Sequence, residues 1–450
     1  MGFLDWSRDK MISWLFPELR PGRDAQKVEL ARAYRTGAQR PQIKIKPMQA
    51  DDNVIINLCG LIADRSVSAL FGKGFEINYP GEGDESALGV YLETQLDASN
   101  QEVLFHRLGL YGVEGGTCYI KFVPDADYIR LIAIDPAWVT LETDPEDFER
   151  VTVYVIAYKV GTGDGEIARK QIIKINPDTG GWIIQDWQAD MNSHGKFYLV
   201  RQVDWQFDFA PILYWQNLPS NEVYGQADLT PDVIQLQDRI NFLASNINRI
   251  IRYHAHPMRY MTGGANADKL TLGPDEILRL GTGDTLQQLE MQSDLAGSLR
   301  FLELLRQSIM DTTRTVDISS MTDRVGALTN FGLRVLWRDA LSKIETKREL
   351  YGDAIIEMLR RLLIIGGINE TTATAYVSGI SIVWPDVLDA DEREQVAALK
   401  TDVELGILSK QTAAQLRGYD WQVETERLQE EAAASDNVGA AILRAFRQGQ

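Results

Sequence analysis

The sequence predicts an α+β protein in which helix predominates. Apolar residues recur every three or four positions over long stretches towards both ends of the chain, which is the period of amphipathic helices. Between them, residues 150–215 are β-rich and are broken by the turn sequences GTGDG and NPDTGG, which is typical of an antiparallel meander. With 44% hydrophobic and 24% charged residues among 450, the chain is expected to fold and could hold two or three domains.

The N-terminal part predicts alternating helices and strands. We expect a short helix in DWSRDKMISWLF before Pro17, and a second from Asp51 to about Leu70, which Gly72 and Gly74 stop. A strand in FEINY follows. The next elements are helices near 85–97 and 101–113 and strands in CYIKFV and IRLIAI.

A long helix begins at Thr230, where a capping residue, a proline and an acid follow one another, and it ends before Pro257. Its apolar residues form a heptad seam: Val233, Leu236, Ile240, Leu243, Ile247 and Ile250. A parallel stripe is polar: Gln237, Asn241, Ser245 and Asn248. We expect that one hairpin cannot cover a seam of roughly 36 Å, so that the returning helix and a neighbouring subunit both pack on it. The polar stripe is then expected to face solvent.

Short strands and turns follow this helix, and a second helix returns from Ser293 to about Thr315. After the loop DISSMTDRVGALTN, a helical pattern runs from Asn330 to about Ile365, with a kink expected at Gly352. A strand in ISIVW precedes an acidic helical tail. In that tail, one helix is expected to end at Gly406 and another to be capped by Ser409.

Charge and composition restrict the function. The net charge is −18, so any contact with DNA should be local, weak or repulsive. The two cysteines, Cys59 and Cys118, lie far apart on segments that look buried, which suggests a reducing compartment. No run approaches the ~18 apolar residues of a membrane span, so we expect a soluble protein that is intracellular when made.

Catalytic motifs are not apparent. GTGDGE and FGKGFE lack the ending and the context of a phosphate-binding loop, and VSGIS is not a nucleophile elbow. His254 and His256 would point to different faces of a helix. Asp204 and Asp208 would share one face of a strand, which leaves a metal-dependent hydrolase as a remote alternative. We therefore expect no enzyme, no cofactor and no metal.

The order of these segments resembles the portal (head–tail connector) proteins of tailed double-stranded-DNA bacteriophages. Several stretches are similar to the local patterns of that family: NVIINLCGLIADRSVSALFG, NLPSNEVYGQADLTPDVIQLQDRIN, NFGLRVLWRDALSKIETKRELYGDAI and VELGILSKQTAAQLRGYDWQVETERLQEE. The resemblance extends over nearly the whole chain. It implies a portal fold and a homododecameric ring at one capsid vertex, with a channel for DNA packaging and ejection.

The resemblance also implies a division of the chain into named regions. These are a wing (1–225 and 330–385), stem helices (226–256 and 293–315), a clip (257–292), a tunnel loop (316–329) and a crown (386–450). The implied tunnel-loop tip comprises Ser319, Ser320, Met321, Thr322, Asp323 and Arg324. It carries one acid and one base, which differs from a plainly acidic or plainly basic constriction.

The implied partners are other copies of the chain, double-stranded DNA without sequence preference, a packaging terminase, major capsid or scaffold protein, and head–tail adaptor proteins. The implied location is the virion, and the host cytoplasm during assembly. A channel lined mainly by acids and neutral groups would repel phosphates and let DNA slide. An alternative is another ring-forming head–tail adaptor, which would share the partners and lack the tunnel loop and clip.

Overall fold

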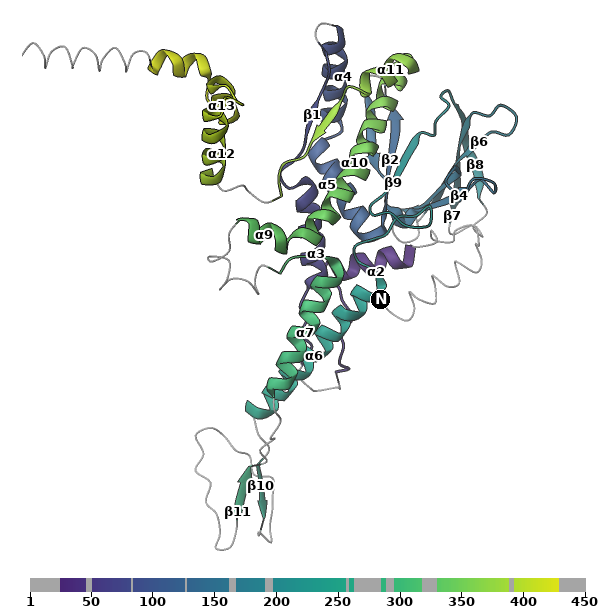
Figure 1. Cartoon of the computed structure of the whole chain (residues 1–450). Coiled ribbons are helices and arrows are strands. Elements are labelled where there is room, and N and C mark those ends of the chain that lie inside the picture. The colour runs from purple at the N-terminus through teal and green to yellow at the C-terminus, as the bar shows by residue number, and fades with distance from the viewer. Residues whose placement is uncertain are drawn as a thin grey trace, which may run out of the picture. The chain divides into compact units, whose positions relative to one another are not determined.

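The structure, a computed structural model, describes residues 25–45, 51–81, 84–125, 128–161, 167–190, 197–255, 259–262, 285–288, 295–317, 330–387 and 392–428. The chain forms two compact units (Figure 1). The first comprises residues 1–326 and 336–385, and the second comprises residues 327–335 and 386–450.

The first unit combines helices with two main antiparallel sheets. Its helices are α2 (Ala25–Arg35), α3 (Leu58–Phe71), α4 (Asp84–Ala98), α5 (Gln101–Gly115), α6 (Pro231–Ala255), α7 (Leu295–Thr313), α10 (Arg338–Ile365) and α11 (Glu370–Val377). A three-stranded sheet has the order β3 (Ile129–Ala133), β2 (Thr117–Pro124) and β9 (Ile212–Gln216). The predicted mixed α+β class with predominant helix is confirmed.

The β-rich stretch is an antiparallel meander, as predicted. Its five strands pair in chain order: β4 (Val139–Thr143), β5 (Val151–Val160), β6 (Ile167–Ile175), β7 (Trp182–Asp190) and β8 (Tyr198–Trp205). Two smaller antiparallel pairs join β1 (Glu76–Asn78) to β12 (Ser381–Val383), and β10 (Arg259–Thr262) to β11 (Thr285–Gln288).

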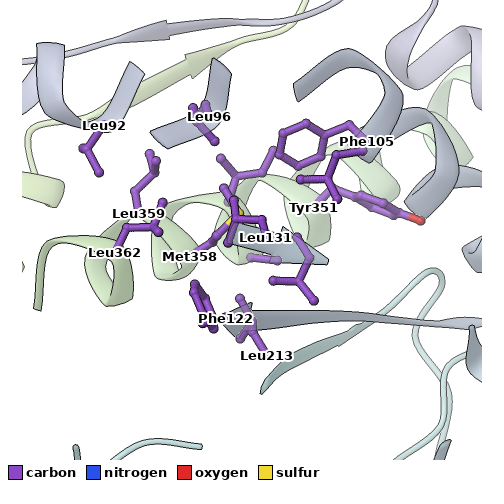
Figure 2. Close-up of a cluster of buried hydrophobic side chains, with 14 of the residues drawn as sticks. Leu92, Leu96, Phe105, Phe122, Leu131, Leu213, Tyr351, Met358, Leu359 and Leu362 are labelled. Carbon is purple, nitrogen blue, oxygen red and sulfur yellow. The ribbon is translucent and has the colours of Figure 1, made fainter. Parts of the chain in front are cut away.

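The main core lies between α10 and its neighbours. Figure 2 shows Met358, Leu359 and Leu362 of α10 among side chains from α4, α5 and the three-stranded sheet, such as Leu92 and Phe122. Burial of such side chains stabilises the fold by about 25 cal/mol for each Å² of apolar surface removed from water. A second cluster joins α3 to the near ends of α6 and α7. The long hairpin of α6 and α7 is thereby anchored to the body.

The second unit is helical. It contains α9 (Asn330–Leu336), α12 (Glu392–Glu404), α13 (Lys410–Leu416) and a helix over residues 421–428. The left-handed Gly406 follows α12, and the side chain of Ser409 accepts a hydrogen bond from Thr412 N at the start of α13. Both helix-end predictions are confirmed.

Three predictions about the helices need correction. The helix expected from Asp51 begins only at Leu58, where Asn57 caps it, and residues 51–57 are not helical. The long C-terminal helix is interrupted at Trp337 and runs unbroken through the buried Gly352. The helices α2 and α11 were not predicted. The short helix expected before Pro17 lies outside the described residues.

Candidate functional site: the helical hairpin and its root

The helices α6 and α7 lie side by side as an antiparallel hairpin, with the β10–β11 pair in the excursion between them (Figure 1). They span Pro231–Ala255 and Leu295–Thr313, close to the predicted stem ranges. The capping sequence at Thr230 and the proline at 257 explain the ends of α6, because proline is favoured in a first turn and disfavoured inside a helix.

The heptad seam of α6 is covered within one chain to a greater extent than expected. Val233, Ile240 and Ile247 are buried, whereas the alternate members, Leu236, Leu243 and Ile250, are half-buried. The cover comes from α3 as well as α7, because Val233 and Ile240 share a core cluster with residues of both helices. The hairpin does not cover the seam alone, as expected, but the additional cover for half of its members comes from α3 of the same chain, which was not predicted.

The polar stripe of α6 does not face solvent, and this prediction is wrong. Gln237, Asn241 and Ser245 are completely buried, and only Asn248 is exposed. The non-helical segment 52–57 and the first residue of α3, Leu58, run along the stripe and lie where solvent was expected.

The stripe and this segment form a ladder of side-chain to backbone hydrogen bonds. The backbone N–H of Val54 donates to Ser245 Oγ (2.9 Å), that of Ile56 to Asn241 Oδ1 (3.0 Å) and that of Leu58 to Gln237 Oε1 (3.1 Å). Gln237 Nε2 also donates to the carbonyl of Ile56 (2.6 Å). Two residues of an extended strand rise about 6.6 Å and four residues of a helix rise about 6.0 Å, so partners at these spacings stay in register.

Charged and amide groups add further bonds to the ladder. At one end, Arg249 and Arg252 form ion pairs of 3.2 and 2.8 Å with the buried carboxylate of Asp52. At the middle rung, Asn241 Nδ2 donates to Gln39 Oε1 (2.5 Å). Buried polar groups are tolerated when hydrogen-bonded, so the stripe serves as an internal joint between α6 and the segment before α3.

A buried charged cluster lies at the root of the hairpin. Asp228, two residues before the capping Thr230, forms ion pairs with Lys343 and with Lys347 (2.5 Å to the latter), which lie one turn apart on α10. Asn217 Nδ2 donates to the same carboxylate (3.2 Å). Lys343 Nζ also donates to the carbonyl of Thr313, the last residue of α7 (2.9 Å). The two lysines therefore hold the roots of both hairpin helices.

Burial and charge act in opposite directions on this cluster. Burial raises the pKa of Asp228, but the charges of Lys347 and Lys343 outweigh it, and the pKa ends well below its usual range. For Lys347, burial lowers the pKa, and the attraction of Asp228 offsets this only in part. The carboxylate is therefore charged at neutral pH.

A close backbone contact places Asp228. At Gly116 (φ +76°), an added Cβ would lie 2.2 Å from the carbonyl oxygen of Gly225, so only glycine fits. The N–H of Asn217 donates to the Gly116 carbonyl (2.8 Å), and that of Asp228 donates to the Val113 carbonyl (3.1 Å). These bonds hold the chain from β9 to α6 against the end of α5.

Sequence reasoning did not find this cluster. A signal was available, because Lys347 interrupts the buried stripe of α10 formed by Ala340, Tyr351, Ala354 and Met358. A lysine within an otherwise apolar stripe predicts a buried charge with a partner.

The hairpin also exposes apolar side chains. On α7, Leu299 is 52% exposed, Phe301 53% and Leu304 55%. The face of α7 towards α6 is marked by Leu302, Leu305 and Ile309. At 100° per residue, Leu299 lies on one flank of that face, and Phe301 and Leu304 lie on the other.

Other predicted site residues lie outside the described part of the chain. They are Ser319, Ser320, Met321, Thr322, Asp323 and Arg324. The structure describes the chain on both sides of them, up to Asp317 and from Asn330. On the near side, Arg306 pairs with Asp317 (3.0 Å), and Arg65 donates to the Val316 carbonyl (2.5 Å).

The structure gives no third ligand to the pair Asp204 and Asp208, both of which are exposed. Among the described residues there is no group of three or more His, Cys, Asp or Glu side chains that could hold a metal ion. In the same part of the chain, no helix has both the length and the apolar character to cross a membrane.

The chain has an α+β body that carries a long two-helix hairpin, a small strand pair in the excursion of the hairpin, and a separate helical C-terminal unit. These features together place it in the class of phage portal folds. Residues 23–437 match the family model described as "Phage portal protein, SPP1 Gp6-like", and the chain belongs to this family. The resemblance predicted from the sequence is confirmed.

Two solved structures are similar to the chain, and both come from gene transfer agent (GTA) particles. One is titled "Virion of native gene transfer agent (GTA) particle", with 14% identity and a TM-score of 0.43. The other, "Neck of native GTA particle computed with C12 symmetry", has 13% identity and a TM-score of 0.43. Each covers 89% of this chain and 96% of the solved chain. A comparison with curated proteins gives no match.

Proposed function

We propose that copies of this chain form a closed ring at one capsid vertex and that the ring encloses the channel through which DNA is packaged and ejected. Membership of the portal family supports a portal or connector role. In this proposal the protein is structural and not an enzyme. A separate terminase ATPase docks on it first, and head–tail adaptor proteins replace the terminase later.

The observation that carries the ring is the pair of exposed apolar flanks on α7. A ring of identical subunits needs head-to-tail contacts between two different surfaces of each copy. Leu299 on one flank, and Phe301 with Leu304 on the other, provide two such surfaces beside the α6 contact. The half-buried Leu236, Leu243 and Ile250 of the seam would be covered further by the neighbouring stem.

Replacing Phe301 by lysine should therefore prevent ring assembly. Truncation of one aromatic anchor in an interface already weakens binding by about 2 kcal/mol or more. A lysine at position 301 also buries a charge in each contact between neighbouring subunits, so we expect it to weaken assembly further. Native mass spectrometry is expected to show the ring fraction of Phe301→Lys reduced at least about tenfold, with the circular dichroism spectrum of the wild type.

Gln307→Lys is the matched control, because Gln307 is exposed on the same helix and gains the same charge. It should assemble normally. A Phe301→Lys protein that forms rings as well as this control would contradict the proposed stem contact.

We propose the remaining regions from the family relation. The wing comprises residues 1–225 and 330–385, the stem 226–256 and 293–315, and the clip 257–292. The tunnel loop comprises residues 316–329, and the crown residues 386–450. The polar stripe of α6 is not part of the proposed channel wall, because three of its four side chains are buried within the chain.

The proposed tunnel loop can be tested by deletion. Removing residues 319–325 should leave ring assembly unchanged, because the proposed contacts between subunits lie on α7, and should reduce DNA packaging or retention if a narrowing of the channel holds the DNA. Native mass spectrometry and a nuclease-protection assay for packaged DNA measure the two effects. Loss of the ring itself would argue against a separate tunnel-loop role.

The proposed partners are DNA bound without sequence preference, the terminase, capsid or scaffold protein and adaptor proteins. The net charge of −18 agrees with a channel that repels phosphates and does not grip them. The proposed location is the virion, with the host cytoplasm as the place of assembly.

A further inference from the structure

A polar cavity of about 250 Å³ lies at the root of the hairpin, between the loop that leads into α6, the end of α7 and α10. Its charged lining residues are Asp228, Lys343 and Arg314. Four threonines, Thr230, Thr312, Thr313 and Thr346, also line it. All of these residues come from a single chain, so the cavity does not require assembly of a ring.

Positive charge exceeds negative charge at this cavity. Asp228 is the one carboxylate in the lining, and two lysines, Lys343 and Lys347, both pair with it. The buried Lys347 and the nearly buried Lys343 against one buried carboxylate leave an excess positive charge, which an additional anion would stabilise because uncompensated buried charge is costly. The exposed Arg314 offers a further cation at the rim.

Hydrogen-bond donors remain for such an anion. The ammonium group of Lys343 has three donors, and its contacts with Asp228 and with the Thr313 carbonyl use two of them. The hydroxyls of Thr230 and Thr312 can rotate to donate, whereas those of Thr313 and Thr346 already donate to carbonyls of their own helices. The first turn of the 25-residue helix α6 adds backbone N–H groups and the positive end of its dipole.

Arg314 lines the cavity from the end of α7. It follows the last residue of the helix, and its left-handed φ of +53° ends α7, with the N–H of Thr315 donating to the Met310 carbonyl (2.8 Å). Arg314 is exposed, and its guanidinium makes no ion pair with any described residue.

We propose that this cavity binds a phosphate-class oxyanion, with Lys343 and Arg314 as its cationic ligands. A tetrahedral anion presents acceptor oxygens in several directions, which suits donors from a loop, a helix end and α10. The volume holds such an anion with a few waters, since each water occupies about 30 Å³. The phosphate is either free in solution or part of a DNA backbone that reaches the root of the stem.

The test is a thermal-unfolding titration of the full chain with sodium phosphate, in which sodium chloride keeps the ionic strength constant. A ligand that binds only the folded protein raises its unfolding temperature in a saturable manner. We expect such a rise for the wild type, and ³¹P NMR line broadening should follow the same titration curve.

Two variants should remove the effect. Lys343→Met deletes the ammonium group but leaves the Lys347–Asp228 pair in place, and Arg314→Gly deletes the guanidinium while allowing the left-handed backbone without strain. Each should weaken phosphate binding at least about tenfold, as expected for loss of a charge-assisted hydrogen bond. Arg239→Ala, which removes an exposed arginine of α6 that does not line the cavity, should bind as the wild type does.

The inference is overturned if phosphate gives no saturable rise beyond that of chloride, or if Lys343→Met and Arg314→Gly retain the response of Arg239→Ala. A second titration with a short DNA duplex identifies the source of the phosphate. Displacement of bound phosphate by the duplex supports a DNA phosphate, and binding of inorganic phosphate without displacement supports a free anion. Neither outcome depends on the ring, which native mass spectrometry tests separately.

Discussion

Replacing Gln237 by leucine is expected to lower the free energy of unfolding by about 1–3 kcal/mol, since it leaves the buried N–H of Cys59 without its acceptor, Gln237 Oε1. The N–H of Leu58 and the carbonyl of Ile56 also lose their bonds to the Gln237 amide, but they keep the bond that joins them to each other (2.9 Å). Leucine has a similar volume and cannot bond to any of these groups. Chemical denaturation followed by tryptophan fluorescence measures the loss.

Gln235→Leu is the control for this prediction. It makes the same chemical change two residues away on α6, but Gln235 is exposed, so the unfolding free energy should change by less than about 0.5 kcal/mol. Equal effects of the two substitutions would show that the polar stripe faces water, as the sequence alone suggested. Hydrogen exchange of the amide of Cys59 should also accelerate in Gln237→Leu only, because that amide loses its acceptor.

Replacing Asp228 by asparagine should have a larger effect. It leaves Lys347 buried and Lys343 nearly buried without a counter-charge, and removal of one partner from a buried ion pair costs about 3–5 kcal/mol. Asp232→Asn, a change of the same kind at an exposed acid in the first turn of α6, should cost about 0.3–1 kcal/mol at most. If the two substitutions had equal effects, the root cluster would not hold the hairpin.

The effect of Asp228→Asn should depend on pH. The folded-state pKa of Asp228 is depressed, so its contribution is complete above the pKa of about 3.9 of an unfolded aspartate and is lost as the pH falls towards the folded value. The difference in unfolding free energy between wild type and Asp228→Asn should therefore be constant from about pH 7 to 5 and shrink below about pH 4. A double-mutant cycle with Lys347→Met measures how much of the loss is due to the stranded lysine.

Much of the fold was predictable from local patterns. The meander, the pair α4 and α5, and the helix α6 lie within a few residues of their predicted positions, because each rests on a period sustained over many residues or on a clear capping sequence. The sequence of residues 51–57 was misleading. Val54 and Ile55 have helical spacing with Leu58, but the N–H groups of Val54, Ile56 and Leu58 donate to the side chains of α6 and make no helical bonds.

The functional site was only partly predictable. The exposed flanks of α7 could not be derived from the sequence, because Leu299, Leu302 and Leu305 belong to one apolar pattern and only the packing shows which of them α6 covers. The root cluster joins residues more than a hundred positions apart, Asp228 and Lys347. No spacing rule connects such residues.

The sequence by itself determined the order and type of most elements, the seam of α6, the helix ends at Ser409 and Gly406, and the resemblance to portal proteins, because each depends on residues near one another in the chain. Only the tertiary structure decided which of the two faces of α6 meets water. Amides that bond to water and amides that bond to a crossing segment have the same spacing in a sequence. Their surroundings differ only when residues 52–58, almost two hundred positions earlier, come to lie against them.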